Sequence, residues 1–152
     1  KARALALRAE LSGFGAAEEL GDGASRVLWR KLRDVAPLIA ADAPLWRVST
    51  APTHGHLLVA ALNPREAIYD WGGGLVWLTL GENEADGGAA RLRAALAPLG
   101  GHATLIRAPE ELRTRVAVFE PQPPALAALT ARVKHSFDPK SVLNPGRMYG
   151  KS

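Results

Sequence analysis

Cysteine is absent from this 152-residue chain, and methionine occurs only once, at Met148. The lack of cysteine excludes a disulfide scaffold and fits a reducing compartment. The chain also has no apolar run of about 20 residues, the length that a membrane-spanning helix needs. A signal peptide is excluded because Arg3 and Arg8 interrupt the first apolar stretch. Since the chain begins with Lys1, we expect it to be a piece of a longer protein.

Runs of like charge are also missing. The 19 basic residues, mostly arginine, exceed the 15 acidic residues by a net charge of +4. Without a block of roughly five or more like charges, the chain has no polybasic tail for nucleic acid or a membrane surface. A hydrophobic content of 47% excludes intrinsic disorder. The composition therefore indicates a folded globular domain that slightly favours anionic partners, and we expect no nucleic-acid partner.

The middle of the chain alternates between strand and helix patterns. Short apolar runs predict strands over 45–50, 66–71, 75–80 and 102–108, and longer periodic segments predict helices over 54–62 and 88–99. The glycines at 72–74 suggest a hairpin between the second and third strands. The order β-α-β-β-α-β predicts an α+β fold with a ferredoxin-like antiparallel sheet.

Helices are expected on both sides of this core. Ala/Leu-rich and amphipathic patterns predict helices over 2–12 and 24–40, with a glycine-rich connector between them. Pro37 is expected to end or kink the second of these. A proline-rich linker at 121–124 precedes a last helix that runs to Phe137. We therefore expect an N-terminal helical segment (1–43), a ferredoxin-like core (44–108) and a linker, helix and tail (109–152), all in one structural domain.

Alternation along the predicted strands divides their side chains between two faces. One face would lie under the helices and collects apolar residues: Trp46, Val48, Ile68, Val76, Leu78, Leu80 and Ile106. The opposite face collects Arg47, Ser49, Tyr69, Trp71, Trp77, Thr79 and Arg107. Arginines among large aromatic residues could bind a small carboxylate, stack nucleobases or pack against another domain.

Motifs for self-sufficient catalysis are missing. The sequence contains no G-x-S-x-G, no Walker A motif and no G-x-G-x-x-G. His54 and His56 are poorly spaced for one metal, and no further ligand stands nearby, so no metal site is expected. His102 and His135 are isolated and are expected to be structural or solvated.

The tail carries the most specific pattern. A helix leads into Phe137-Asp138-Pro139, followed by Leu143-Asn144-Pro145-Gly146-Arg147. This segment resembles the C-terminal signature of FAD-linked oxidases of the vanillyl-alcohol oxidase type, and within that family the FAD-binding subunits of glycolate oxidases. Further similar stretches are Leu45–Ser49, Asp70–Gly73 with Trp77, and Gly101–Arg107, so the resemblance covers roughly residues 44–149.

The resemblance implies a function. In this family an N-terminal domain holds the FAD pyrophosphate in a glycine-rich loop, and the C-terminal part forms a cap on the substrate side. This chain has no such loop, so it resembles the cap and return tail, and we expect the fragment alone to be inactive. The implied reaction is oxidation of a 2-hydroxy acid such as glycolate, with hydride passing to the flavin; no residue stands out as the base.

The substrate-binding residues are chosen from the predicted open face of the sheet, and the flavin-side residues and partners follow from the resemblance. We expect a substrate carboxylate to meet Arg47 and Arg107 beside a wall of Tyr69, Trp71 and Trp77. Asn144, Pro145, Gly146 and Arg147 are expected on the flavin side. The implied partners are the missing FAD domain, other glycolate oxidase subunits and a small 2-hydroxy acid. The expected location is the cytoplasm, with membrane association through partner subunits left open.

Two other interpretations stay open. A ferredoxin-like sheet with exposed aromatic residues is also the plan of RNA-recognition domains, although the predicted third strand lacks their aromatic signature. The domain could also act mainly by docking partner subunits. The tail, for its part, could be a structural clamp between domains rather than a flavin contact.

Overall fold

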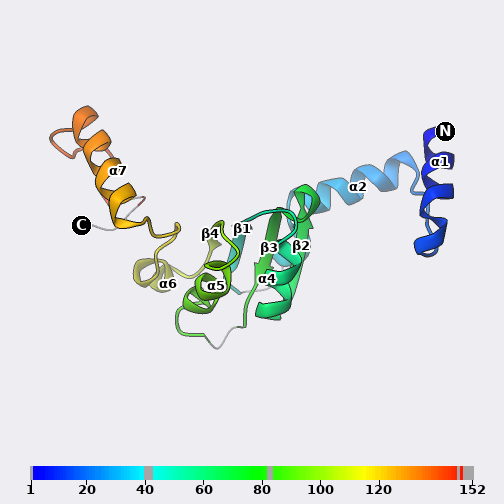
Figure 1. Ribbon diagram of the computed structural model, residues 1–152, viewed down its shortest axis with the longest axis horizontal. Coiled ribbons are helices and arrows are strands. Elements are labelled where there is room, and N and C mark those ends of the chain that lie inside the picture. The colour runs from blue at the N-terminus through cyan, green and yellow to red at the C-terminus, as the bar shows by residue number, and fades with distance from the viewer. Residues whose placement is uncertain (1, 40–42, 82–83, 147, 149–152) are drawn as a thin grey trace. The chain divides into compact units, whose positions relative to one another are not determined.

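The computed structural model describes residues 2–39, 43–81, 84–146 and 148 (Figure 1). The chain divides into two compact units, Lys1–Pro37 and Leu38–Ser152. The predicted division at 43/44 and 108/109 stays a prediction. Within the described parts of the chain, no helix is long and apolar enough to span a bilayer.

The first unit is helical and has little core. It contains α1 (Ala2–Leu11), the 3-10 turn η1 (Ser12–Phe14) and α2 (Asp22–Arg33), none of which buries a residue. The helix predicted over 24–40 is broken. Val35 adopts a left-handed φ of 52°, and the short α3 (Ala36–Ile39) follows with Pro37 in its first turn.

The second unit contains a four-stranded antiparallel sheet. Its strands are β1 (Leu45–Ser49), β2 (Glu66–Asp70), β3 (Leu75–Thr79) and β4 (His102–Arg107), and they lie in the order β2-β3-β1-β4. Helix α4 (Gly55–Leu62) connects β1 to β2, and α5 (Ala89–Leu96) connects β3 to β4. The predicted α+β fold with its β-α-β-β-α-β order is therefore confirmed.

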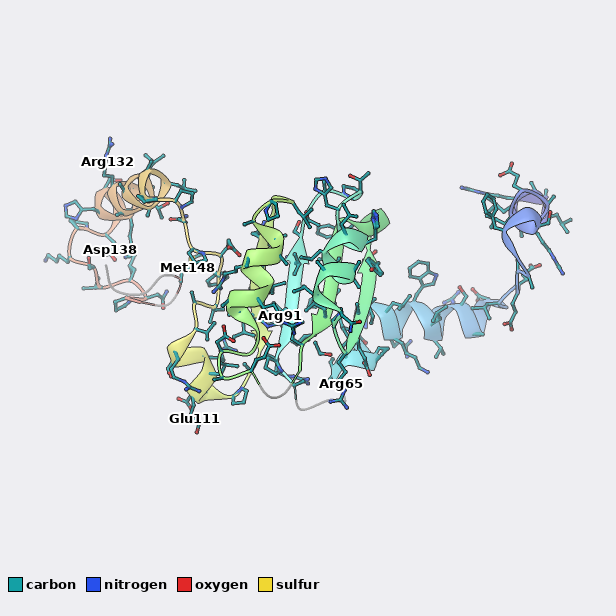
Figure 2. All side chains as sticks on the ribbon, turned by 60° about the horizontal axis from the view of Figure 1, so that its bottom comes forward. Arg65, Arg91, Glu111, Arg132, Asp138 and Met148 are labelled. Atoms are coloured by element: carbon teal, nitrogen blue, oxygen red, sulfur yellow. The ribbon has the colours of Figure 1, made fainter. Side chains whose placement is uncertain are left out.

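Both connecting helices cover the same face of the sheet (Figures 1 and 2). Their leucines at 58, 62, 92 and 96 pack in one cluster with Trp46, Val48, Val76, Leu78 and Leu105. Each such side chain contributes about 1.5–3 kcal/mol when it is removed from water. The Asp86 carboxylate supports α5, because it accepts from the N–H groups of Gly88 (3.0 Å) and Ala90 (2.8 Å).

In β2 and β4, some side chains lie on the opposite face of the sheet from the one that the sequence predicted. In the β2–β3 pairing Ile68 lies opposite Trp77, and Tyr69 lies opposite Val76. Because directly paired residues point to the same side of a sheet, Ile68 shares the face of Trp77, and Tyr69 shares the helix-covered face. In β4 it is Leu105, not Ile106, that faces the core: their exposed fractions are 1% and 41%.

Irregular segments and further helices complete the second unit. The stretch after α6 (Glu110–Arg115), a helix not predicted from sequence, runs along the edge of β4, where the Leu105 N–H donates to the Val118 carbonyl at 2.8 Å. The predicted last helix is confirmed as α7 (Pro124–Phe137). None of the residues of α7 is buried.

We expect Trp46→Phe to destabilise the protein by about 2 kcal/mol. The Trp46 indole is fully buried, and its Nε1 donates to the Gly87 carbonyl oxygen at 2.9 Å. Phenylalanine would leave that buried carbonyl unpaired and would vacate part of the space. Urea denaturation measures the change, with Trp29→Phe as the matched control, because Trp29 is 66% exposed. Equal stabilities for the two variants would contradict this account.

Candidate functional site

Arg47 lies against two indole rings on the sheet face that α4 and α5 leave uncovered. It comes from β1 and pairs with Trp77 of β3. Its guanidinium carbon lies 5.4 Å from the ring centroid of Trp71 and 5.9 Å from that of Trp77. These separations fit cation–π contacts. Among the described residues Arg47 has no hydrogen-bond or ion-pair partner, so its N–H donors can take an anion.

Trp71 reaches Arg47 from a strained turn rather than from a strand. Its backbone has a φ of 50°, and the next two residues, Gly72 and Gly73, have φ values of 63° and 99°. A left-handed conformation costs a non-glycine residue about 1–2 kcal/mol. The turn is held by the Asp70 carboxylate, which accepts from the Trp71 N–H at 2.7 Å. Such strain persists only where the surroundings impose it.

The segment between β1 and α4 supplies those surroundings. The Thr50 N–H donates to the Gly74 carbonyl at 2.9 Å. A Cβ atom on Gly73 would lie 2.6 Å from the Pro52 carbonyl oxygen, and one on Gly55 would overlap the Gly73 carbonyl oxygen. The backbone of the turn and the backbone at the start of α4 are therefore in direct contact, with no side chain between them. This contact holds Trp71, which is 61% exposed, in a defined place.

Tyr69 does not join this cluster. The register places it on the face of Val76, opposite to the face that carries Arg47. It lies on the edge strand and is 46% exposed. Of the three aromatic residues predicted to form a wall, Trp71 and Trp77 lie beside Arg47 and Tyr69 does not, so we leave Tyr69 out of the proposed site.

Arg107 is bound elsewhere. It pairs with Leu45 past a shift in register. Its guanidinium donates to the carbonyl oxygens of Ile39 (2.6 Å), Leu38 (3.2 Å) and Ala43 (3.4 Å). These bonds tie the end of α3 and Ala43 to the end of β4. Because its donors serve the backbone, Arg107 is also left out of the proposed anion site.

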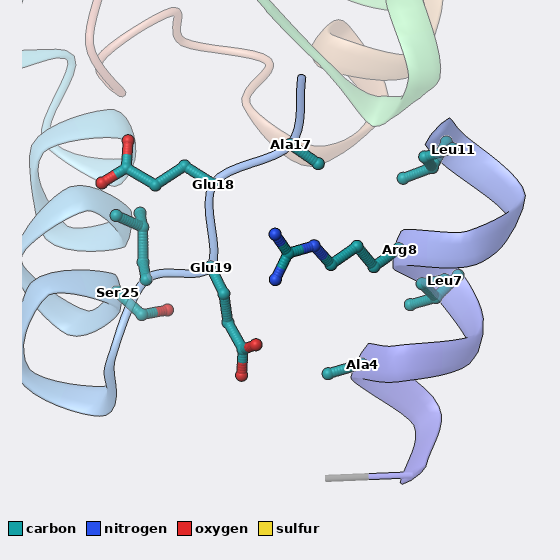
Figure 3. A pocket seen from close by; sticks show the side chains of 9 residues that line it. Ala4, Leu7, Arg8, Leu11, Ala17, Glu18, Glu19 and Ser25 are labelled. Atoms are coloured by element: carbon teal, nitrogen blue, oxygen red, sulfur yellow. The ribbon is translucent and has the colours of Figure 1, made fainter. Parts of the chain in front are cut away.

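Within the described residues, His54 and a hollow in the first unit are other features that a site could use. The Nδ1 atom of His54 lies 2.7 Å from the Leu99 carbonyl oxygen, a structural contact. No group of three metal-ligating side chains occurs in the described ranges. A hollow of about 340 Å³ lies within the first unit, between α1 and the connector that follows it. Figure 3 shows Arg8 pointing across this hollow towards the segment that carries Glu18 and Glu19, and none of the predicted site residues lines it.

The tail forms an ordered turn around Asp138, a residue that sequence reasoning missed. Asp138 follows α7 (Figure 2), and its exposed fraction is only 5%. Its carboxylate accepts from Lys134 Nζ (2.6 Å) and from the N–H groups of Val142 (2.9 Å) and Leu143 (3.0 Å). A signal was present, because an acid at a helix C-terminus opposes the helix dipole unless it is paired.

The residues predicted on the flavin side come next. Asn144, Pro145 and Gly146 are exposed. Asn144 and Gly146 have left-handed φ values of 44° and 71°. Arg147 lies outside the described residues, so its predicted role stays a prediction. The structure thus brings three of the four residues together in one exposed turn.

Acid is expected to open this turn. The Lys134 hydrogen bond, with the two backbone N–H bonds, lowers the pKa of Asp138 from 3.8 to about 2. Because the folded pKa lies below the unfolded one, the ionised carboxylate stabilises the turn above about pH 4, and this stabilisation is lost as the pH falls towards about 2. Hydrogen exchange by NMR should show the Val142 and Leu143 amides losing protection across that window. Asp138→Asn should lack the transition; an unchanged transition in this variant would contradict the assignment.

Comparison with known proteins finds similarity to the glycolate oxidase subunit GlcE of Escherichia coli (strain K12). The two sequences are 32% identical over 141 residues, which make up 90% of this chain and 35% of that relative. The chain thus spans about a third of the relative's length. No protein-family model matches the chain, and no solved structure matches it. The resemblance to a glycolate oxidase subunit, predicted from the sequence, is confirmed by this relative.

Proposed function

We propose that the chain is the C-terminal, substrate-side cap of an FAD-linked glycolate oxidase subunit. The observation that carries this proposal is the similarity to GlcE along 90% of the chain. In the complete protein the cap would help to oxidise a 2-hydroxy acid, and the piece alone would be inactive. The protein would act in the cytoplasm, where partner subunits would determine any association with a membrane.

Arg47 supports the choice of an anionic substrate. A guanidinium presents N–H groups in a planar fork that matches a carboxylate. Here the indoles of Trp71 and Trp77 lie within 6 Å of it, and no acidic side chain in the described ranges neutralises it. An arginine placed in this way would bind the carboxylate of a small 2-hydroxy acid and hold its hydroxyl-bearing carbon in a constant position.

The tail is suited to one edge of the cofactor. FAD, when bound, supplies the acceptor for the hydride from the substrate. The Asn144 amide can donate and accept a hydrogen bond, and a Cβ atom on Gly146 would meet nothing within 4 Å. A flat ring could therefore approach the backbone there. The sequence has no glycine-rich phosphate loop, so the rest of the FAD would be held by another part of the protein.

One face of α7 is suited to docking that other part. Its apolar residues recur at helical spacing and are all exposed: Leu126 (47%), Leu129 (50%), Val133 (52%) and Phe137 (83%). Exposed apolar residues in such a stripe are typical of a surface that another protein surface covers. We assign that role to the FAD domain of the same subunit, and further contacts to the other oxidase subunits.

Anaerobic spectroscopy of the complete protein with its partner subunits tests the function. Glycolate should bleach the flavin absorbance. Acetate, which lacks the hydroxyl group, and ethylene glycol, which lacks the carboxylate, should leave it unchanged. Bleaching by ethylene glycol would remove the need for an anion site. A purified protein that holds no flavin, or whose flavin is not reduced by any 2-hydroxy acid, would overturn the proposal.

A further inference from the structure

Asp138 organises the tail through bonds that reach forward and backward along the chain. Forward, its two carboxylate oxygens bind the N–H groups of Val142 and Leu143, and its carbonyl accepts from the Ser141 N–H at 3.0 Å. Backward, it binds Lys134 on the last turn of α7 at 2.6 Å. Lys134 also donates to the Leu143 carbonyl at 3.3 Å. The five bonds together close the segment 138–143 into a ring against the helix end.

Two residues in or next to the ring have left-handed backbone conformations. Ser141 has a φ of 51°, and Asn144, just after the ring, has a φ of 44°. This conformation costs Ser141 about 1–2 kcal/mol and Asn144 less, because asparagine adopts the left-handed region more readily. Hydrophobic packing does not repay this cost within the segment, since Val142 and Leu143 are 68% and 60% exposed. The charge-assisted bonds to Asp138 are the interactions that hold the turn.

We propose that Asp138, held by Lys134, is a positioning residue that shapes the Asn144–Gly146 turn for its contact with the flavin before the tail docks. The inference rests on the proposed function, because it assumes that this turn meets the flavin. Asp138 itself touches no cofactor; it acts through Asn144. A preformed turn loses less conformational entropy on docking than a free chain does, and binding is tighter for that reason.

Substitutions in the complete subunit separate this role from simple stabilisation. Asp138→Asn keeps the size of the side chain but turns one acceptor into an NH₂ donor, which would face Lys134 or a backbone N–H. We expect it to weaken FAD binding about tenfold, as measured by flavin fluorescence during titration of the apoprotein. Asn144→Ala should weaken it by a similar factor. Lys140→Ala is the matched control, because Lys140 has no partner in the described tail, and it should bind FAD normally.

The double variant gives the decisive readout. If Asp138 acts by placing Asn144, then Asp138→Asn with Asn144→Ala should bind FAD no more weakly than Asn144→Ala alone. Additive losses would show that Asp138 merely stabilises the fold and would overturn the inference, as would normal FAD binding by Asp138→Asn beside weakened binding by Asn144→Ala. Normal binding by Asn144→Ala would instead refute the proposed flavin contact.

A milder variant covers the case in which Asp138→Asn does not fold. Lys134→Met removes the ammonium group but leaves both backbone bonds to the carboxylate. We expect it to weaken FAD binding about threefold, whereas Lys134→Arg should bind FAD normally because it keeps the charge. Normal FAD binding by a folded Lys134→Met protein would overturn the part of the inference that concerns Lys134.

Discussion

Gly55→Ala is expected to destabilise the second unit by about 3 kcal/mol and to lower its melting temperature by roughly 10 °C. Gly55 is the first residue of α4 and is buried. A Cβ atom there would overlap the Gly73 carbonyl oxygen and would lie 3.2 Å from Cγ2 of Val76. A backbone carbonyl within a tight turn cannot rotate away as a flexible side chain can, so the turn itself would have to move.

The expected displacement would also reach the candidate site, because the same turn carries Trp71. Thermal unfolding followed by circular dichroism measures the stability, and Trp71 accessibility can be followed by fluorescence quenching. Gly23→Ala is the matched control: it also lies in the first turn of a helix, and its Cβ atom would meet nothing within 4 Å. If Gly55→Ala and Gly23→Ala melt at the same temperature, the close contact between turn and helix does not exist in solution.

Arg47→Ala in the complete oxidase is expected to raise the KM for glycolate about 100-fold and to change kcat little. Two charge-assisted hydrogen bonds to the carboxylate would be lost. Because the carboxylate does not change during the oxidation, that loss falls on ground state and transition state alike. Arg47→Lys should raise KM about tenfold, since a point charge replaces the planar fork.

Steady-state kinetics with glycolate measures both parameters. Arg113→Ala provides the control, because Arg113 is exposed on α6 and has no partner among the described side chains. A KM within twofold of the unmodified enzyme for Arg47→Ala would remove Arg47 from the substrate site. A large loss in kcat alone would give Arg47 a different role, at the reacting atoms.

Much of the fold follows from local patterns. Alternating apolar residues, helical periodicity and the prolines and glycines between them were enough to predict all four strands, the two core helices and α7. Each of these signals acts over a few residues, so a single sequence contains it. The failure at Val35, where the predicted helix breaks, reflects a left-handed residue that no local preference of valine would indicate.

The faces of the strands were harder to predict, because they depend on how strands are paired. The prediction extended the second strand to Trp71, which put Tyr69 and Trp71 on one face. In the structure β2 ends at Asp70, and the turn that follows sets a register in which Tyr69 opposes Val76. Trp71 still reaches Arg47, but it does so through its left-handed turn.

The sequence by itself determined the α+β class, the order of the elements, the likeness to a glycolate oxidase subunit and the choice of Arg47, Trp71 and Trp77 as candidate site residues. These depend on residue types and short spacings. Only the tertiary structure decided that Arg107 serves the backbone, that Tyr69 lies on the other face and that Asp138 closes the tail. The physical reason is that a hydrogen bond or a strand register joins residues whose partners are chosen by the folded backbone, and neighbours in the chain do not reveal that choice.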